Sequence, residues 1–306
     1  MRDAGYTPGG AGRRSGFVAL LGRPNVGKST LLNRILGTRI AIVTNKPQTT
    51  RDRIAGIYTG PRGQIIFLDS PGIHHARRAL NEYMVRTAER IAAEADVVVH
   101  IVDDRPTGTG EEERLVQTLL DRIPVPRVLL LNKVDRTGEA VAGRRRTELM
   151  ETGLYSRGFL VSATKGSGVE EFLEYLYGIL PEGPDYYPED ELTDLPMRFI
   201  AKEIIREKLF EFLTDELPYS VAVAIEEYNE DAERNLIRIR AEIYVERESQ
   251  KGMVIGKGGR MLRNVGTAAR RELEKETGER VYLDLFVKVV RDWSRKETML
   301  RRLGYA

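Results

Sequence analysis

A short apolar run followed at once by a glycine-rich loop constrains this chain more than any other feature. Residues 17–21 read FVALL, and residues 22–29 read GRPNVGKS. A buried strand that leads into this spacing of glycine, lysine and serine is typical of a phosphate-binding loop, in which successive backbone N–H groups face phosphate oxygens. Lys28 would add a positive charge, and Ser29 could ligate Mg²⁺. The segment is therefore predicted to hold a nucleoside triphosphate.

A second apolar run ends in a carboxylate. Residues 64–69 read QIIFLD, and SPG follows at 70–72. The phosphate-loop pattern at 22–29 alone arises by chance in about one chain of this length in a hundred. Whether it marks a nucleotide site therefore depends on the motifs that follow it, of which this is the first. Asp69 is placed to hold the Mg²⁺ shell, and the N–H of Gly72 can reach the terminal phosphate. A loop that contacts this phosphate responds to its presence, so the segment is a candidate switch.

A third pair of motifs selects the base. Residues 128–131 read VLLL and deliver NKVD at 132–135, while FLV at 159–161 leads to SATKG at 162–166. The carboxylate of Asp135 can accept hydrogen bonds from N1–H and the exocyclic amine of guanine, whereas adenine would direct a lone pair at it. The backbone N–H of Ala163 could meet guanine O6. The sequence therefore favours GTP over ATP.

These four motifs, in this order, resemble those of the translation-factor-related class of small GTPases. The sequence between them, including TTRD at 49–52, narrows the resemblance to the Era family of bacterial GTPases and extends it from about residue 16 to residue 305. The resemblance implies that Thr50 ligates Mg²⁺ in a first switch, with Thr49 as the alternative. Ser70 stands where the class often has threonine, and residues 1–15 match nothing that we can assign.

The implied reaction is hydrolysis of GTP to GDP and phosphate, mainly through positioning and charge neutralisation. We expect catalytic roles for Asn25, Lys28, Thr50 and Gly72, and Mg²⁺ ligation by Ser29, Thr50 and Asp69. The predicted nucleotide contacts are Gly22, Arg23, Pro24, Asn25, Val26, Gly27, Lys28, Ser29, Thr30, Asp69, Gly72, Asn132, Lys133, Asp135, Ser162 and Ala163.

One familiar catalytic group is missing from the second switch. Ile73 stands where Ras-like enzymes place the glutamine that orients the attacking water, so slow intrinsic turnover is expected. By resemblance, Asn25 would help to hold K⁺ beside the phosphates, and K⁺ joins Mg²⁺ as an expected cofactor. His74 and His75 follow closely but have no identifiable partner, so they receive no role. His100, inside an apolar run, is expected to be structural.

Length and composition indicate a two-domain intracellular protein. A chain of 306 residues corresponds to about two domains. The absence of cysteine excludes disulfides and thiolate metal sites. Residues 1–15 lack the apolar core of a signal peptide, and no apolar run of about eighteen residues occurs. We therefore expect a cytoplasmic protein, and we leave open a peripheral membrane-associated fraction.

The first domain is predicted to be an α/β fold with a doubly wound, mostly parallel sheet. Strands are expected near 16–21, 54–59, 64–69, 96–102, 127–131 and 158–161, and the pair around residues 61–63 should form an antiparallel hairpin. Residues 181–196 contain four prolines, six acidic residues and no basic residue, which suits an extended, self-repelling linker. The predicted boundaries are 1–15 for an unassigned extension, 16–180 for the GTPase domain, 181–196 for the linker and 197–306 for the second domain.

The second domain is predicted to be a smaller α+β fold. A helix over 199–213, strands at 220–228 and 236–245, a further helix, GKGG at 256–259, a helix from about residue 260 and a strand over 281–289 follow in that order. This order resembles a type II KH domain, whose GxxG loop lets a nucleic-acid backbone approach and whose groove holds about four unpaired nucleotides. Tyr219 and Phe286 are additional candidates for stacking a base.

The charge around the GxxG loop also indicates a nucleic-acid partner. Residues 251–271 contain six basic side chains and no acidic one. The predicted RNA contacts are Lys251, Ile255, Gly256, Lys257, Gly258, Gly259, Arg260, Arg263 and Arg270. By resemblance, the partners besides GTP and GDP would be small-subunit ribosomal RNA near its 3′ end and the small ribosomal subunit, whose maturation the protein would assist; no DNA is expected. The alternative is a GTPase whose second domain recruits a protein partner or a membrane surface.

Overall fold

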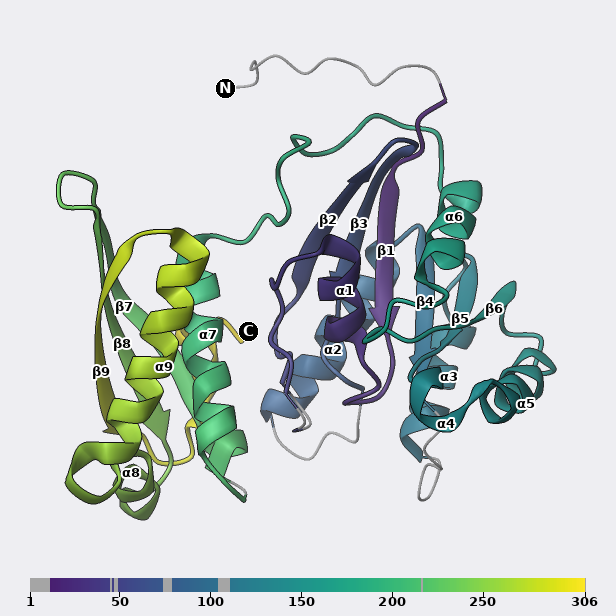
Figure 1. The fold of residues 1–306 in the computed structure, drawn as a ribbon. Coiled ribbons are helices and arrows are strands. Elements are labelled where there is room, and N and C mark those ends of the chain that lie inside the picture. Colours follow the sequence, from purple (N-terminus) through teal and green to yellow (C-terminus); the bar gives the residue numbers. More distant parts are fainter. Residues whose placement is uncertain are drawn as a thin grey trace. The chain divides into compact units, whose positions relative to one another are not determined.

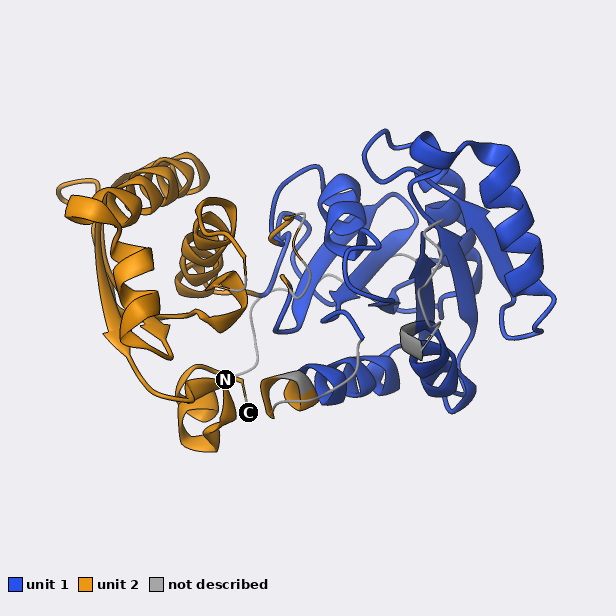
Figure 2. Ribbon diagram, turned by 90° about the horizontal axis from the view of Figure 1, so that it is seen from below, with its two compact units in different colours: residues 1–41, 50–75, 84–194 blue, residues 42–49, 76–83, 195–306 orange. Residues whose placement is uncertain are grey.

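The computed structural model describes residues 12–44, 46, 49–73, 79–103, 111–215 and 217–305. The chain divides into two compact units, coloured separately in Figure 2. Unit 1 comprises residues 1–41, 50–75 and 84–194, and unit 2 comprises residues 42–49, 76–83 and 195–306. His74 and His75 lie outside the described residues. Among the described helices, none is both long and apolar enough to cross a membrane.

Unit 1 is built on a six-stranded sheet with the strand order β2-β3-β1-β4-β5-β6. The strands are β1 (Gly16–Leu21), β2 (Ile54–Gly60), β3 (Gly63–Asp69), β4 (Val97–Val102), β5 (Arg127–Leu131) and β6 (Arg157–Leu160). Only β2 runs antiparallel to its neighbour, and the other pairings are parallel. The predicted α/β fold, with its hairpin around residues 61–63, is confirmed.

Helices cover both faces of this sheet (Figure 1). They are α1 (Lys28–Leu36), α2 (Ala79–Glu94), α3 (Glu111–Asp121), α4 (Val134–Thr137), α5 (Glu139–Met150) and α6 (Val169–Ile179). Successive residues of a strand point to opposite faces. Ala19 and Leu21 accordingly share a core with residues of α2, α3 and α5, while Val18 and Leu20 are buried on the other face. The carboxyl ends of β1, β3, β4, β5 and β6 therefore meet at one edge, where ligands of such sheets bind.

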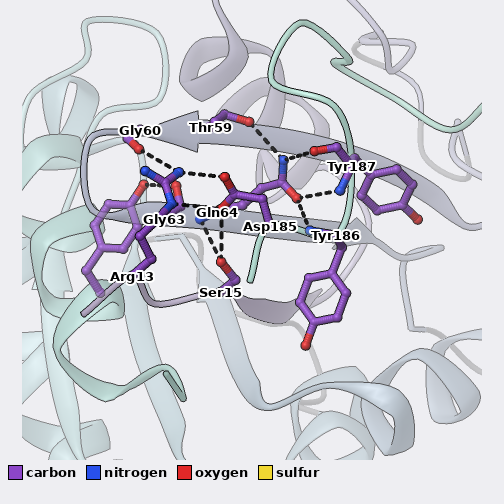
Figure 3. Close-up of polar contacts among 10 residues, drawn as sticks. Arg13, Ser15, Thr59, Gly60, Gly63, Gln64, Asp185, Tyr186 and Tyr187 are labelled. Atoms are coloured by element: carbon purple, nitrogen blue, oxygen red, sulfur yellow. Dashed lines mark hydrogen bonds and ion pairs between the residues drawn. The ribbon is translucent and has the colours of Figure 1, made fainter. Parts of the chain in front are cut away.

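The acidic segment after α6 is fastened to unit 1, whereas the sequence predicted a self-repelling extended linker. Its main anchor is Gln64, which is fully buried at the start of β3. The Gln64 Nε2 donates to Thr59 Oγ1 and to the carbonyl of Tyr187, both at 3.0 Å. Its Oε1 accepts from the backbone N–H groups of Tyr186 and Tyr187 at 2.8 and 3.0 Å (Figure 3). All the hydrogen-bonding positions of one carboxamide are thus used.

Further contacts continue this attachment along β2. Arg13 forms an ion pair with Asp185 at 2.7 Å (Figure 3). The N–H of Ile57 donates to Leu192 O at 2.9 Å, and Thr193 Oγ1 donates to Ala55 O at 2.7 Å. Because β2 is an edge strand, these bonds cover its exposed backbone. We call residues 185–194 the strap. Its acidic composition suggests repulsion within the segment, whereas its basic and amide partners, Arg13 and Gln64, lie far away in the chain.

Unit 2 contains a three-stranded sheet with the order β7-β8-β9. Its elements are α7 (Met197–Phe212), β7 (Ala222–Asp231), β8 (Leu236–Val245), α8 (Glu248–Ile255), α9 (Arg260–Thr277), β9 (Arg280–Val289) and α10 (Glu297–Arg302). Strands β7 and β8 are antiparallel, and β8 and β9 are parallel. Helices α7 and α9 lie on one face of the sheet (Figure 1). The predicted order of elements is confirmed, although β7 begins later than expected because residues 217–220 form a 3₁₀ turn.

Candidate nucleotide site and nucleic-acid interface

The loop between β1 and α1 has the backbone conformation that its glycines permit. Gly22 and Gly27 have φ angles of 151° and 102°. A Cβ on Gly22 would lie 2.3 Å from the carbonyl oxygen of Ile101, and one on Gly27 would lie 2.2 Å from Nδ2 of Asn132. These contacts are too short for any side chain. The loop can therefore pass close to β4 and β5 only with glycine at both positions.

Lys28, the first residue of α1, is buried inside this loop. Its Nζ donates to the carbonyl oxygens of Gly22 and Arg23 at 3.1 and 3.0 Å. Burial lowers the pKa of Lys28 to about 8, and the nearby carboxylate of Asp69 opposes this shift. The ammonium group thus lies where the loop encloses it, in the position that the phosphate-binding role requires.

Three oxygen-bearing side chains converge next to Lys28. Ser29 Oγ donates to Asp69 Oδ2 at 2.6 Å and lies 3.0 Å from Thr50 Oγ1. Oδ1 of Asp69 is buried and has no hydrogen-bond partner among the described residues. Burial raises the pKa of Asp69, and Lys28 and the two hydroxyl groups counteract this shift. A small hard cation binds carboxylate and hydroxyl oxygens, so this set of residues fits Mg²⁺.

The side-chain contacts distinguish Thr50 from Thr49, which the sequence leaves as alternatives. Thr50 Oγ1 faces Ser29 and lies 3.4 Å from Oδ2 of Asp69. Thr49 Oγ1 instead donates to the carbonyl of Lys46 at 2.8 Å and lies 2.9 Å from Thr44 Oγ1. Thr49 therefore closes its own loop, and of the two hydroxyl groups it is that of Thr50 which lies beside Ser29 and Asp69.

The second switch passes directly over the phosphate loop. A Cβ on Gly72 would lie 2.7 Å from the Cα of Pro24, so no larger residue fits. The N–H of the next residue, Ile73, donates to Gly22 O at 3.2 Å. The Ile73 side chain is buried in the core of unit 1. It therefore offers no polar group to a water molecule at the phosphates.

Asn132 connects three loops at the edge of the sheet. Its Nδ2 donates to Val26 O at 2.8 Å, and its Oδ1 accepts from the N–H groups of Lys133 at 2.8 Å and Ala163 at 3.0 Å. The Ala163 N–H, for which the sequence predicts a contact with guanine O6, donates to the Asn132 amide oxygen in this structure. The two residues can meet because Ala163 follows β6, Asn132 follows β5, and these two strands are neighbours in the sheet.

Asp135 is exposed at the start of α4 and is oriented by hydroxyl groups. Its Oδ1 accepts from Ser162 Oγ at 2.5 Å, and its Oδ2 accepts from Thr164 Oγ1 at 3.4 Å. The bond from Ser162 is the main cause of a lowered pKa for Asp135. The carboxylate is thus held in its ionised form, which can only accept hydrogen bonds. This is the property that selection of guanine requires.

Asp103 was not predicted from the sequence, although it joins two of the predicted motifs. It directly follows β4 and is buried. Oδ1 accepts from Arg23 Nη2 at 3.2 Å, and Oδ2 accepts from Lys133 Nζ at 2.8 Å. The Lys133 ammonium also donates to Asn25 O. A carboxylate directly after an apolar strand was the signal used for Asp69, and the same signal would have identified Asp103.

The GxxG loop of unit 2 exposes its main chain. Gly256, Gly258 and Gly259 have φ angles of 72°, 62° and 74°. A Cβ on Gly256 would lie 2.7 Å from Cβ of Met261, whereas a Cβ on Gly258 or Gly259 would meet nothing within 4 Å. The open side of the loop therefore faces solvent with no side chain to obstruct it, and α9 begins immediately after it.

Basic side chains surround this loop. Lys257, Arg260, Arg263, Arg270 and Arg271 are exposed, Lys251 is half-buried, and Ile255 packs against the core of unit 2. Within the described part of the chain, the one ion pair of these basic residues joins Arg270 to Glu274 at 3.9 Å. The charge is therefore available to phosphate groups.

The apolar face of α9 is already occupied. Val265, Ala269 and Leu273 are fully buried in the core against the sheet. An amphipathic helix that binds a membrane must insert such a face into the lipid. The packing of α9 therefore argues against the membrane alternative.

Comparison with known proteins agrees with both halves of this description. The model of the 50S ribosome-binding GTPase family matches residues 17–133, and the KH domain model matches residues 216–294. The chain is 48% identical to GTPase Era of Geobacter metallireducens over 292 residues, which covers 95% of this chain and 98% of that protein. It is 43% identical to GTPase Era of Carboxydothermus hydrogenoformans, with coverage of 95% and 98%.

Two solved structures are similar over almost the whole chain. Each has a TM-score of 0.90 and 39% identity and covers 96% of this chain and 99% of the other. One is a variant of Aquifex aeolicus Era bound to GDP·AlF₄⁻. The other is Era in complex with MgGDPNP and nucleotides 1506–1542 of 16S ribosomal RNA.

Proposed function

The chain belongs to the Era family of GTPases, and we propose that GTP hydrolysis controls its binding to single-stranded small-subunit ribosomal RNA near the 3′ end. In this proposal it assists maturation of the small ribosomal subunit in the cytoplasm. Residues 16–180 act as the GTPase domain and residues 197–306 as the RNA-binding domain. The observation that carries the RNA assignment is the open GxxG loop surrounded by basic side chains, of which only Arg270 has an acidic partner within the described residues.

The residues of unit 1 bind and position the triphosphate. The backbone N–H groups of the phosphate loop and the ammonium of Lys28 would hold its oxygens. Ser29, Thr50 and Asp69 would hold Mg²⁺, which neutralises charge on the phosphate oxygens when it is bound. Gly72 passes close enough to the loop for its N–H to reach the terminal phosphate. Loss of that phosphate would release the loops of Thr50 and Gly72, which is the basis of the switch.

The base is selected at the other end of the site. Asp135 accepts the two donors of guanine, and Ser162 orients the carboxylate for this role. Asn132 holds the base motif against the phosphate loop through Val26. With adenine, the Asp135 carboxylate would face a lone pair, which explains the preference for GTP.

The charge that stabilises the transition state must come from outside the second switch. Ile73 is buried and apolar, so it cannot orient water. Asn25 has a left-handed backbone with φ of 62° inside the phosphate loop, and its carbonyl accepts from Lys133. We propose that Asn25 helps to hold K⁺ beside the phosphates. The monovalent cation would then supply part of the charge that an arginine finger supplies elsewhere.

Filter binding of labelled single-stranded ribosomal RNA fragments tests the proposed function. The fragments are compared with GDP, with GTP and with a non-hydrolysable GTP analogue bound to the protein. A double substitution, Lys257→Asp with Gly258→Asp, places two carboxylates at the open side of the loop and should abolish RNA binding by repulsion. GTP affinity should be unchanged, because the nucleotide site lies in unit 1. Retained RNA affinity in the folded double variant would disprove the KH assignment and favour the protein-partner alternative.

A further inference from the structure

Unit 2 exposes two aromatic rings on a face of its sheet that the GxxG loop does not use. Tyr282 and Phe286 of β9 are 53% and 43% exposed. The residues that alternate with them, including Val281 and Val287, are buried in the core against the helices. Helices α7 and α9 lie on one face of the sheet (Figure 1). Because side chains alternate along a strand and Val281 and Val287 face these helices, Tyr282 and Phe286 point to the opposite face.

The strand register surrounds Tyr282 with guanidinium groups. In the parallel pairing of β8 and β9, Arg238 lies beside Tyr282 and Arg240 lies beside Asp284. Arg280 lies two residues before Tyr282 on the same face. Both Arg238 and Arg280 are exposed, and neither forms an ion pair with an acid within the described residues. These two cations therefore remain available to a ligand next to the Tyr282 ring.

The second aromatic ring, that of Phe286, lies against an arginine that is already paired. Arg240 forms an ion pair with Glu227 of β7 at 3.2 Å, and its guanidinium lies 4.9 Å from the centroid of the Phe286 ring. Between the two rings the surface has a shallow hollow of about 400 Å³. Glu227, Arg238, Arg240, Tyr282, Asp284 and Phe286 line it. Hollows of this size hold small ligands in many proteins.

The chemistry of this hollow matches an unpaired nucleotide. An exposed tyrosine offers a face on which a base can stack, and guanidinium groups beside it attract phosphate. The carboxylate of Asp284 can accept a hydrogen bond from the exocyclic amine of a base, as acidic side chains do with cytosine. A uracil has no exocyclic amine, so this hydrogen bond to Asp284 would be missing. The combination of ring, cation and carboxylate is more specific than a general basic surface.

We propose that this outer face, formed by Arg238, Arg280, Tyr282 and Asp284, is a second RNA site that takes an unpaired, amine-bearing nucleotide. The inference rests on the proposed RNA-binding function and extends it. Strand β9 is the edge of its sheet, so the two faces are separated by the width of a single strand. A single strand that occupies the groove beside the GxxG loop can pass over this edge and reach Tyr282. The domain then contacts more RNA than the four or so nucleotides that a KH groove holds.

The test compares two variants of Tyr282 with two lengths of RNA. Tyr282→Ala removes the ring, and Tyr282→Phe is the matched control because it keeps the ring. The probes are a single-stranded ribosomal RNA fragment of about four nucleotides, which fills the groove alone, and one of about twelve. Tyr282→Ala should weaken the long RNA about tenfold or more and leave the short RNA unchanged, and Tyr282→Phe should restore the long RNA to wild-type affinity. Replacing single amine-bearing bases of the long RNA by uracil should reproduce the loss at one position.

Each other outcome has a definite meaning. If Tyr282→Ala binds the long RNA as tightly as the wild type does, the second site is overturned. The proposed function still stands in that case, as long as the wild type binds both fragments. Equal weakening of both RNAs shows damage to the groove and also overturns it. Normal RNA affinity with reduced binding to the small ribosomal subunit assigns the face to a protein partner instead. If the wild type binds neither fragment, the proposed function itself fails.

Discussion

Ser29 donates a hydrogen bond of 2.6 Å to Asp69, although β2 and the first switch lie between them in the chain. The pairing follows from the sheet, because β1 and β3 are parallel neighbours and Leu20 lies directly beside Asp69. The helix that begins after β1 therefore starts next to the last residue of β3. Because the carboxyl ends of β1 and β3 are adjacent, Ser29 and Asp69 come together at the proposed metal position.

Substitution of Ser29 tests this assembly. Ser29→Ala removes one oxygen ligand and the bond that orients the Asp69 carboxylate. We expect the affinity for Mg²⁺·GTP to fall by roughly 10- to 100-fold. Titration with a fluorescent GTP analogue, in Mg²⁺ and in EDTA, measures the effect. Ser156→Ala, at an exposed serine, is the control. A similar loss in EDTA would mean that Ser29 acts on the loop and not through the metal.

The base motif predicts a change of nucleotide specificity. Asp135→Asn replaces a group that only accepts hydrogen bonds by an amide that also donates. The variant should lose affinity for GTP and gain affinity for xanthosine triphosphate, whose base presents a carbonyl where guanine has an amine. Competition titrations with the two nucleotides measure both changes. Unchanged GTP affinity would remove Asp135 from the base pocket.

The buried Ile73 leads to a prediction about salt. At constant ionic strength, exchange of Na⁺ for K⁺ should raise the rate of GTP hydrolysis, because K⁺ near Asn25 would replace missing positive charge. Asn25→Ala should abolish the difference between the two salts. The steady-state rate of phosphate release is the measurement. Equal rates of the wild type in both salts would rule out the K⁺ hypothesis.

Prediction from the sequence worked where the determinants are contiguous. Each apolar run followed by its motif, such as FVALL before Gly22 or VLLL before Asn132, encodes a strand and the loop at its end, so the parallel sheet and its edge could be inferred. Asp103 belongs to no motif, and its partners Arg23 and Lys133 come from two other loops. The place of Asp103 directly after an apolar strand marks it as a candidate, but which groups it binds depends on tertiary packing.

Two other features were ambiguous for physical reasons. Thr49 and Thr50 are chemically identical neighbours, and only the path of the backbone decides which hydroxyl faces Ser29. The strap was interpreted from its own acidic composition, whereas its conformation depends on Gln64 and Arg13, more than a hundred residues away. Local composition predicts the behaviour of a segment in isolation, and these contacts are long-range.

Gln64 offers a direct test of the strap. Gln64→Leu would leave the partly buried N–H groups of Tyr186 and Tyr187 without their acceptor. A fully buried unsatisfied group costs about 1–3 kcal/mol, so the loss for each of these groups lies below that range. We expect a lower free energy of unfolding and faster amide hydrogen exchange in the strap. Gln117→Leu on α3 is the matched control, because no described side-chain bond depends on it. Unchanged exchange at Tyr186 and Tyr187 would show that the strap is held by its other contacts.

His100 predicts how stability depends on pH. It is fully buried in β4, and its Nδ1 lies 2.7 Å from the hydroxyl of Tyr155. Burial, aided by nearby positive charges led by Arg23, lowers the pKa of His100 to about 3 from its ordinary value of 6.5. At pH values between 3 and 6.5, His100 binds a proton in the unfolded chain but not in the folded chain. The contribution of neutral, buried His100 to the free energy of unfolding is therefore complete above pH 6.5 and is lost as the pH falls toward 3.

The expected size of this effect follows from the linkage relation. Between pH 7.5 and pH 5, His100 should cost the folded state about 2 kcal/mol. Denaturant unfolding at the two pH values, in the wild type and in His100→Asn, isolates the contribution, because the asparagine amide can occupy the position of Nδ1 without titrating. The variant should lose less stability than the wild type on acidification, even if it is less stable at pH 7.5. An equal loss in both proteins would mean that His100 is protonated in the folded state and that other groups cause the acid sensitivity.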